Sequence, residues 1–171
     1  MDKEMLKEIQ GRTIKMLKET GSVEPALFIE GPEEDQGVIL ANIGFSNDKE
    51  KLDMMLNIGR EFAYMKPISV TLVTEAWMMH GAPSQGKRIS DMPERQECIV
   101  VMHDRHAPNR YQMACQIPFT KIGKDIVLGE SLEISTDDAE ARIENAILLP
   151  FWLGVSSAYL EPKAPKDTKA N

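Results

Sequence analysis

The chain has 171 residues, of which 42% are hydrophobic and 27% charged, values typical of a soluble globular domain. No apolar run approaches the roughly 18 residues that a membrane-spanning helix needs, and two cysteines are too few for a disulfide scaffold. The net charge of −7 argues against a nucleic-acid partner. We expect one α+β domain over residues 1–160 and a disordered tail over 161–171.

The N-terminal segment predicts an amphipathic helix. From Met5 to Leu17, apolar side chains recur at spacings of three and four residues and so share one helical face. Gly21 is a helix stop signal. The segment is charged throughout, unlike a secretory leader, and we therefore expect a cytoplasmic protein.

Two short apolar runs, residues 26–29 and 37–40, flank an acidic Gly/Pro turn and predict a hairpin. A second helix is expected from Asn47, because Asn47 and Glu50 have the spacing of a capping box. Pro67 ends that helix.

Residues 68–79 are rich in β-branched side chains and give the strongest strand signal in the chain. We expect the side chains from Ile68 to Met78 at even positions to face the core. Further strands are predicted over 97–102, 111–119 and 126–134. A third helix is predicted over 139–148, ended by Pro150.

Short links between the strands demand antiparallel pairing. The sequence therefore predicts an antiparallel meander sheet of about five or six strands. Two or three helices are expected to pack mainly on one face of this sheet.

The segment from Gly81 to Lys87 matches the first seven positions of the phosphate-binding loop motif. Arg88 occupies the position of the hydroxyl that ligates magnesium, and Pro93 leaves no room for the helix that the mechanism needs. Parallel strands would also require a longer crossover between 68–79 and 97–102. We therefore predict a hairpin with a long tip and no nucleotide hydrolysis.

The loop over 81–95 remains a candidate site because long structureless loops are often functional. Seven basic and four acidic residues lie between positions 87 and 124, giving a local charge of +3. Lys87, Arg88 and Arg95 are candidate ligands for an anionic small molecule. The alternative is a solvated loop that balances acidic neighbours.

His80, His103 and His106 are candidate metal ligands, but His80 and His103 should lie at opposite ends of the predicted hairpin. No metal site and no cofactor is assigned. Cys98 and Cys115 alternate into the core pattern and are expected to be buried. Glu75, in mid-strand, is expected to be exposed.

Residues 147–153 form the strongest interaction signal, since they are uncharged and contain Phe151 and Trp152. This run either closes the core or forms a subunit interface, where buried aromatic residues concentrate. Trp77, on the second face of its strand, is the other candidate interface residue.

Residues 74–77 (TEAW), 93–97 (PERQE) and 99–101 (IVV) resemble a pattern in uncharacterised prokaryotic and phage-associated proteins. The resemblance covers under a fifth of the chain and implies an origin but no activity. The sequence favours a non-catalytic binding or assembly module that self-associates. The alternative is an enzyme or binding protein for an anionic small molecule, with its site under the 81–95 loop.

Overall fold

The computed structural model describes residues 3–33, 35–44, 47–79, 88–137 and 147–160. The predicted tail, the phosphate-loop-like segment and most of the predicted third helix lie outside these ranges. In chain order the elements are α1 (Lys3–Thr20), β1 (Ala26–Glu30), β2 (Gly37–Ala41), α2 (Asp48–Phe62), η1 (Ala63–Met65), β3 (Ser69–Met78), η2 (Ile89–Asp91), β4 (Gln96–Arg105), β5 (Tyr111–Ile122), β6 (Asp125–Leu128), β7 (Leu132–Thr136) and α3 (Leu149–Leu160).

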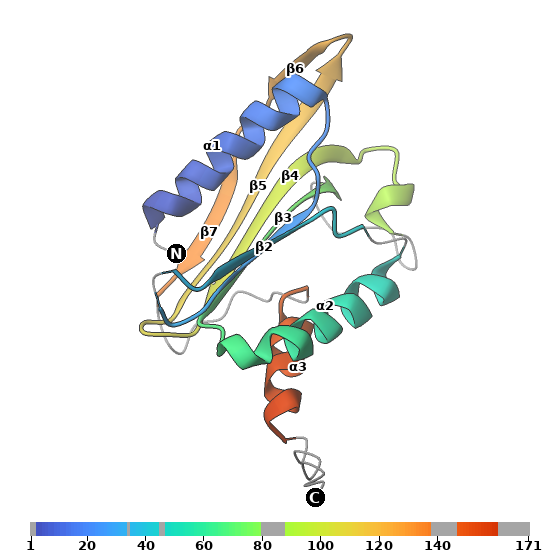
Figure 1. The fold of residues 1–171 in the computed structure, drawn as a ribbon. Helices are drawn as coiled ribbons and strands as arrows, with labels where there is room; N and C mark the ends of the chain where they lie inside the picture. The colour runs from blue at the N-terminus through green and yellow to red at the C-terminus, as the bar shows by residue number, and fades with distance from the viewer. Residues whose placement is uncertain (1–2, 34, 45–46, 80–87, 138–146, 161–171) are drawn as a thin grey trace, which may run out of the picture.

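The strands form one antiparallel sheet in the order β2-β1-β3-β4-β5-β6, and β7 also pairs with β5 (Figure 1). The α+β class is confirmed. The path departs from a simple meander at the first hairpin, where β1 rather than β2 lies beside β3. The strand predicted over 126–134 is split into β6 and β7, which pair with successive parts of β5.

The pairing of β3 with β4 is antiparallel along ten residue pairs, from Ser69 opposite Arg105 to Met78 opposite Gln96. This confirms the predicted hairpin. It also excludes the parallel strand–helix–strand setting that a phosphate-binding loop needs. The strand β4 extends beyond the predicted Met102, so that His103 lies in the sheet and not in a turn.

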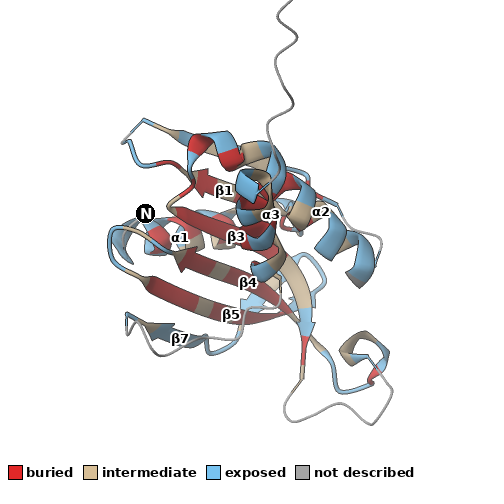
Figure 2. Ribbon diagram, turned by 90° about the horizontal axis from the view of Figure 1, so that it is seen from below, coloured by how far each residue is buried: buried red, intermediate tan, exposed pale blue. Residues whose placement is uncertain are grey.

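Helices cover both faces of the sheet. Two of them, α2 and α3, share one face, and α1 lies across the other (Figure 1). The central strands are therefore buried, while β7 is exposed at one side (Figure 2). The expectation that only one face of residues 68–79 lies in the core was too narrow, because Thr71 and Val73 are buried under α1.

Two large cores result, one on each face of the sheet, and Met78, Cys98 and Val100 form a third, smaller cluster. Under α1 the buried residues are Leu6, Ile9, Leu17, Val23, Val73, Ile99, Val101, Tyr111, Met113, Cys115, Ile117 and Phe119. Under α2 and α3 they are Leu27, Ile29, Ile43, Met55, Ile58, Ala63, Val70, Leu72, Leu148, Phe151, Trp152 and Val155. Both cysteines are buried and free, as predicted.

The helix α2 begins as the sequence predicts. Asn47 has an extended backbone, and its side-chain oxygen accepts a hydrogen bond from the Glu50 N–H at 2.9 Å. The helices α2 and α3 approach closely at Gly59 and Gly154, where an added Cβ would overlap the main chain of the facing helix.

The helix α3 was not predicted, and the predicted helix over 139–148 lies mostly outside the described residues. Pro150, expected to end a helix, lies in the first turn of α3. Proline is tolerated there because the first N–H groups of a helix have no intrahelical acceptor. Within the described part of the chain, no helix has both the length and the apolar character to cross a membrane.

Candidate functional site

A buried polar pair joins β3 to β4 beneath α1. The Thr71 Oγ1 and His103 Nδ1 atoms lie 2.8 Å apart, and His103 is fully buried. Burial lowers the pKa of His103 to about 4, so the imidazole is neutral at pH 7. From the sequence, His103 is a candidate metal ligand, and among the described residues it belongs to no cluster of three or more metal-ligating side chains.

A second polar group ties α3 to the end of β4. The Trp152 Nε1 atom donates to Asp104 Oδ2 at 3.1 Å, and the His106 ring stacks on the Trp152 ring with centroids 3.8 Å apart. Burial alone would raise the pKa of Asp104. The hydrogen bond and positive charge of His106, with a hydrogen bond from Gln112, outweigh it and hold that pKa below its ordinary value.

These contacts place the two aromatic residues of the run 147–153 in the core, whereas Leu149 and Leu153 of the same run are exposed. Phe151 is fully buried and Trp152 nearly so, and both belong to the core between α3 and the sheet. Their rings contact His106, Asp104 and each other within the chain. The polar group around Asp104 therefore positions α3 and closes the core.

Of the three residues proposed for an anion, the structure describes Arg88 and Arg95, and only Arg95 lines the hollow beside Trp77. Lys87 lies outside the described residues, and Arg88 is exposed. The Arg95 guanidinium stacks on the Trp77 ring at 4.5 Å from its centroid and donates to the Ser90 carbonyl. The hollow beside Trp77, about 400 Å³, is lined by one base and one acid, Arg95 and Asp91, among its five residues. Trp77, the other candidate interface residue, is 41% exposed, and the Arg95 guanidinium lies over its ring.

Glu75 differs from its prediction. It is half-buried, and its Oε1 atom accepts a hydrogen bond from the Val23 N–H at 2.6 Å. The Glu75 carboxylate thus serves as the hydrogen-bond acceptor for a main-chain N–H just after α1. The two thiols are equally unsuited to chemistry, because burial raises the pKa of Cys98 and of Cys115 to about 11.

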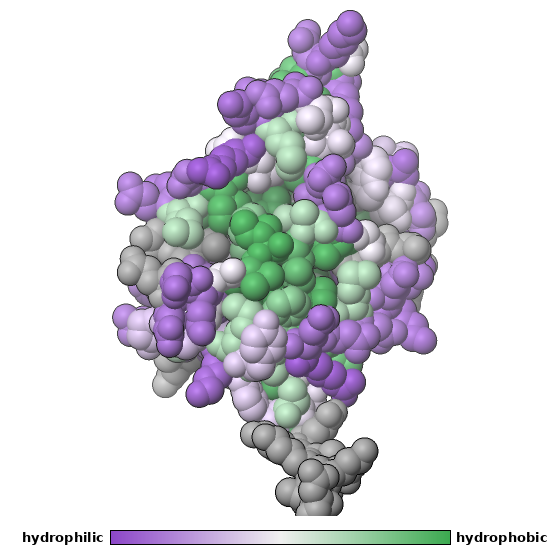
Figure 3. Space-filling model, in the orientation of Figure 1, coloured by the Kyte–Doolittle hydropathy of each residue, from purple (hydrophilic) through white to green (hydrophobic). Residues whose placement is uncertain are grey.

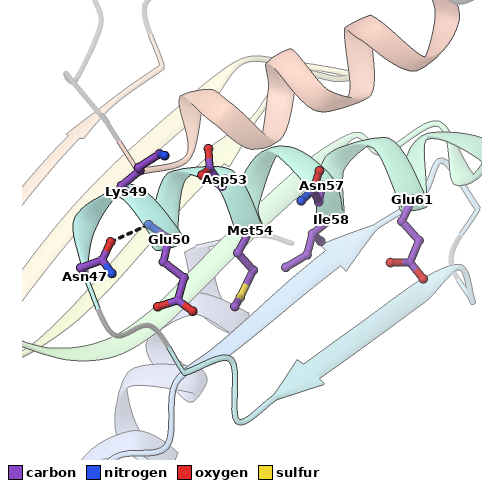
Figure 4. A pocket seen from close by; sticks show the side chains of 8 residues that line it. All are labelled: Asn47, Lys49, Glu50, Asp53, Met54, Asn57, Ile58 and Glu61. Atoms are coloured by element: carbon purple, nitrogen blue, oxygen red, sulfur yellow. Dashed lines mark hydrogen bonds between the residues drawn. The ribbon is translucent and has the colours of Figure 1, made fainter.

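A hollow of about 620 Å³ runs along α2 (Figure 4). Its eight lining residues come from this helix and its N-cap. Glu50, Met54, Ile58 and Glu61 point the same way along the helix and do not converge on one point. It therefore has the form of a solvated helix side.

A more specific concavity lies between α1 and the first hairpin. This α1–β2 groove has a volume of about 430 Å³ and is lined mainly by apolar side chains. The lining residues are Met5, Glu8, Ile9, Arg12, Thr13, Met16, Glu24, Ala26, Phe28, Ile39 and Val73. Figure 3 shows the apolar side chains gathered at the centre of the molecule on this face. The groove exists because α1 packs over β3, β4 and β5 and leaves the β1–β2 part of that face uncovered.

The outer strand beside the groove is β2, with the sequence GVILA. It is the first strand in the sheet order, so among the described residues no strand pairs with its outer side. Ile39 is 65% exposed. Exposed sheet edges are usually protected by charged residues, proline or bulges, and β2 contains none of the three.

The main-chain groups of β2 have a defined direction. The Gly31 N–H donates to the Gln36 carbonyl at 2.6 Å, and Phe28 lies opposite Ile39. Hydrogen-bonded and non-hydrogen-bonded pairs alternate in antiparallel sheets. Val38 and Leu40 therefore direct their main-chain groups toward β1, and Ile39 directs its N–H and carbonyl outward.

Sequence reasoning did not identify this site. The apolar run over 37–40 predicts a strand and forms most of β2, but the place of β2 at the sheet edge depends on whether β1 or β2 pairs with β3. The signal in the sequence that could have indicated this site was an uncharged strand next to a turn. Comparisons of the chain with protein-family models, curated proteins and solved structures found no match. The resemblance to phage-associated proteins therefore stays a prediction.

Proposed function

We propose that this protein is a binding and assembly module that self-associates, and that its contact surface is the outer edge of β2. The observation that carries the proposal is an uncharged apolar edge strand next to an uncovered apolar groove. Adding a strand to such an edge satisfies its main-chain groups and buries its apolar side chains.

The β2 strand is suited to antiparallel pairing with the same strand of a second copy. A two-fold axis at Ile39 makes each Ile39 donate its N–H to the Ile39 carbonyl of the other copy. The same register sets Gly37 opposite Ala41 and Val38 opposite Leu40, so that no charged side chain faces another. The strand is thus complementary to itself, as a two-fold interface requires.

The charges around β2 favour this antiparallel arrangement. The acidic turn before β2 includes Glu33 and Asp35, whereas residues 42–44 after it are uncharged. Antiparallel pairing sets each turn beside residues 42–44 of the other copy and keeps the two acidic turns apart. A parallel arrangement would bring them together, which a chain with a net charge of −7 disfavours.

Pairing through β2 also accounts for the groove. Ile39 lies on the same face as Phe28 and Val73, and the uncovered parts of two such faces would adjoin across the axis. The two α1 helices would then border one continuous apolar floor. A cytoplasmic location is part of the proposal, because the two free buried thiols suit a reducing compartment.

The experiment compares two isoleucines that are equally exposed and lie in strands at different edges. Ile39 in β2 and Ile134 in β7 are each 65% exposed. In sedimentation equilibrium, Ile39→Lys should weaken the wild-type association at least tenfold, because it sets two like charges opposite each other. Ile134→Lys is the matched control and should leave the association unchanged.

A charge-pair rescue tests the register. Ile39→Glu should weaken association as Ile39→Lys does, and an equimolar mixture of the two variants should restore it. A monomeric wild-type protein at high concentration would overturn the proposal. So would an Ile39→Lys variant that associates like the wild type.

A further inference from the structure

The last helix carries a second apolar surface that the β2 edge does not use. No residue from Leu149 to Leu160 is charged. The side of α3 with Phe151 and Val155 lies in the core, yet Leu149, Leu153 and Leu160 are 57%, 54% and 82% exposed. A helix that is apolar on all sides is normally covered on all sides.

The exposed residues form one continuous seam. At 100° per residue, Leu149, Leu153, Ser156 and Leu160 lie within about 60° of one another around the helix axis. Their spacings of four, three and four residues are those of the contact positions of a coiled coil. This periodicity is typical of a helix side that packs against another helix.

We propose that the α3 seam packs against the α3 seam of a second copy, with the two helices antiparallel. The order of the seam residues is symmetric about its centre, since 149 and 160 lie equally far from it on opposite sides, and so do 153 and 156. An antiparallel pair therefore sets Leu149 beside Leu160 of the second copy, and Leu153 beside the small Ser156. Each bulky residue at the centre meets a small one, as interdigitating packing requires.

Other occupants fit the seam less well. Residues 161–171, which follow α3, contain no large apolar side chain and so cannot cover three leucines. Helices that lie on membranes usually carry basic residues on their polar side, and α3 has none. A second α3 offers the same uncharged apolar seam.

This contact is independent of the β2 pairing and uses a different part of the chain. The β2 edge borders the α1 face of the sheet, whereas α3 packs on the opposite face beside α2 (Figure 1). Two separate two-fold contacts on one chain link more than two copies. The inference is that the protein assembles beyond a dimer, through alternating β2 and α3 contacts.

Sedimentation of variants separates the two contacts. Wild-type protein should exceed the mass of a dimer. Ile39→Lys and Leu153→Glu should each leave dimers, and the double variant should be monomeric. Ile122→Glu is the control, because Ile122 is a 60% exposed apolar residue at the end of β5, away from both surfaces.

Disulfide trapping tests the helix direction. Leu153→Cys and Ser156→Cys proteins, mixed and oxidised with oxidised glutathione, should form cross-links between the two variants. The native thiols are buried and do not interfere. Cross-links only between identical variants would indicate parallel helices and overturn the antiparallel packing.

Three outcomes would overturn the α3 proposal. If the Ile39→Lys variant is monomeric at every concentration, the α3 contact is rejected and the β2 contact is retained. Unchanged association of Leu153→Glu in the Ile39→Lys background would do the same. Flotation of Ile39→Lys protein with phosphatidylcholine vesicles, lost when Leu153→Glu is added, would assign the seam to lipid instead.

The opposite result would reject the β2 contact. If Leu153→Glu alone loses association and Ile39→Lys associates like the wild type, the α3 contact is retained and the β2 contact is rejected.

Discussion

Gly154 of α3 lies directly against the Leu56 carbonyl of α2, so closely that a Cβ on Gly154 would overlap that oxygen. Gly59 of α2 is placed in the same way against the Phe151 carbonyl. The two glycines let the helix backbones touch, and this contact brings Phe151 and Trp152 down onto the sheet. The position of α3 thus depends on the absence of two side chains.

Gly154→Ala should therefore destabilise the protein although alanine favours helices. The added methyl group meets main chain, which cannot rotate away, and overpacking of this kind costs about 1–3 kcal/mol. Gly11→Ala is the control, since Gly11 lies in α1 with nothing within 4 Å of an added Cβ. It should stabilise by about 0.5–1 kcal/mol. Urea unfolding measures both, and equal effects of the two substitutions would contradict the close crossing.

Trp152→Phe should cost about 1–3 kcal/mol, because it removes the N–H that Asp104 accepts and leaves a buried carboxylate short of a partner. A double-mutant cycle with Asp104→Asn isolates this contact. The coupling free energy should be clearly favourable in urea unfolding at pH 7. Strictly additive effects would show that the hydrogen bond contributes nothing.

Asp104 should also make the fold sensitive to strong acid. Its pKa in the folded chain is lowered below the ordinary 3.8. The stabilisation is therefore fully present above about pH 4 and is lost as pH falls through the folded value. The free energy of unfolding should drop below pH 4, and Asp104→Asn should flatten that drop. An unchanged slope in the variant would assign the effect to other carboxylates.

His103 should act at higher pH. Unfolded, its imidazole takes up a proton near pH 6.5, and folded only near pH 4. Between these values the unfolded chain binds the additional proton, so stability decreases as pH falls and is constant above pH 6.5. At about 1.4 kcal/mol per pH unit, the loss by pH 4 is about 3 kcal/mol.

His103→Gln tests this expectation, since glutamine retains a hydrogen-bonding group for Thr71 but does not titrate. The variant should show a free energy of unfolding that is nearly constant from pH 6.5 to 4, measured by urea unfolding at each pH. A wild-type protein equally stable at pH 4.5 and 7 would contradict the burial of a neutral His103.

The elements that local chemistry specifies were predictable. Residues 68–79 are rich in β-branched side chains and form β3, Asn47 caps α2 through its own side chain, and the short links between β1 and β2 and between β4 and β5 force antiparallel pairing. The helix α3 was not predicted, because the same Pro150 can end one helix or begin another. Which of these occurs depends on packing and not on the residues next to it.

The sequence by itself determined the strands, two of the helices and the α+β class, because hydrophobic periodicity and capping act over a few neighbouring residues. Only the tertiary structure decided which sides of those elements stay uncovered. The exposed side of β2 and the outer seam of α3 follow from long-range choices, namely β1 beside β3 and α3 against α2 at Gly59. A periodic pattern tells which residues share a face, but not what covers that face.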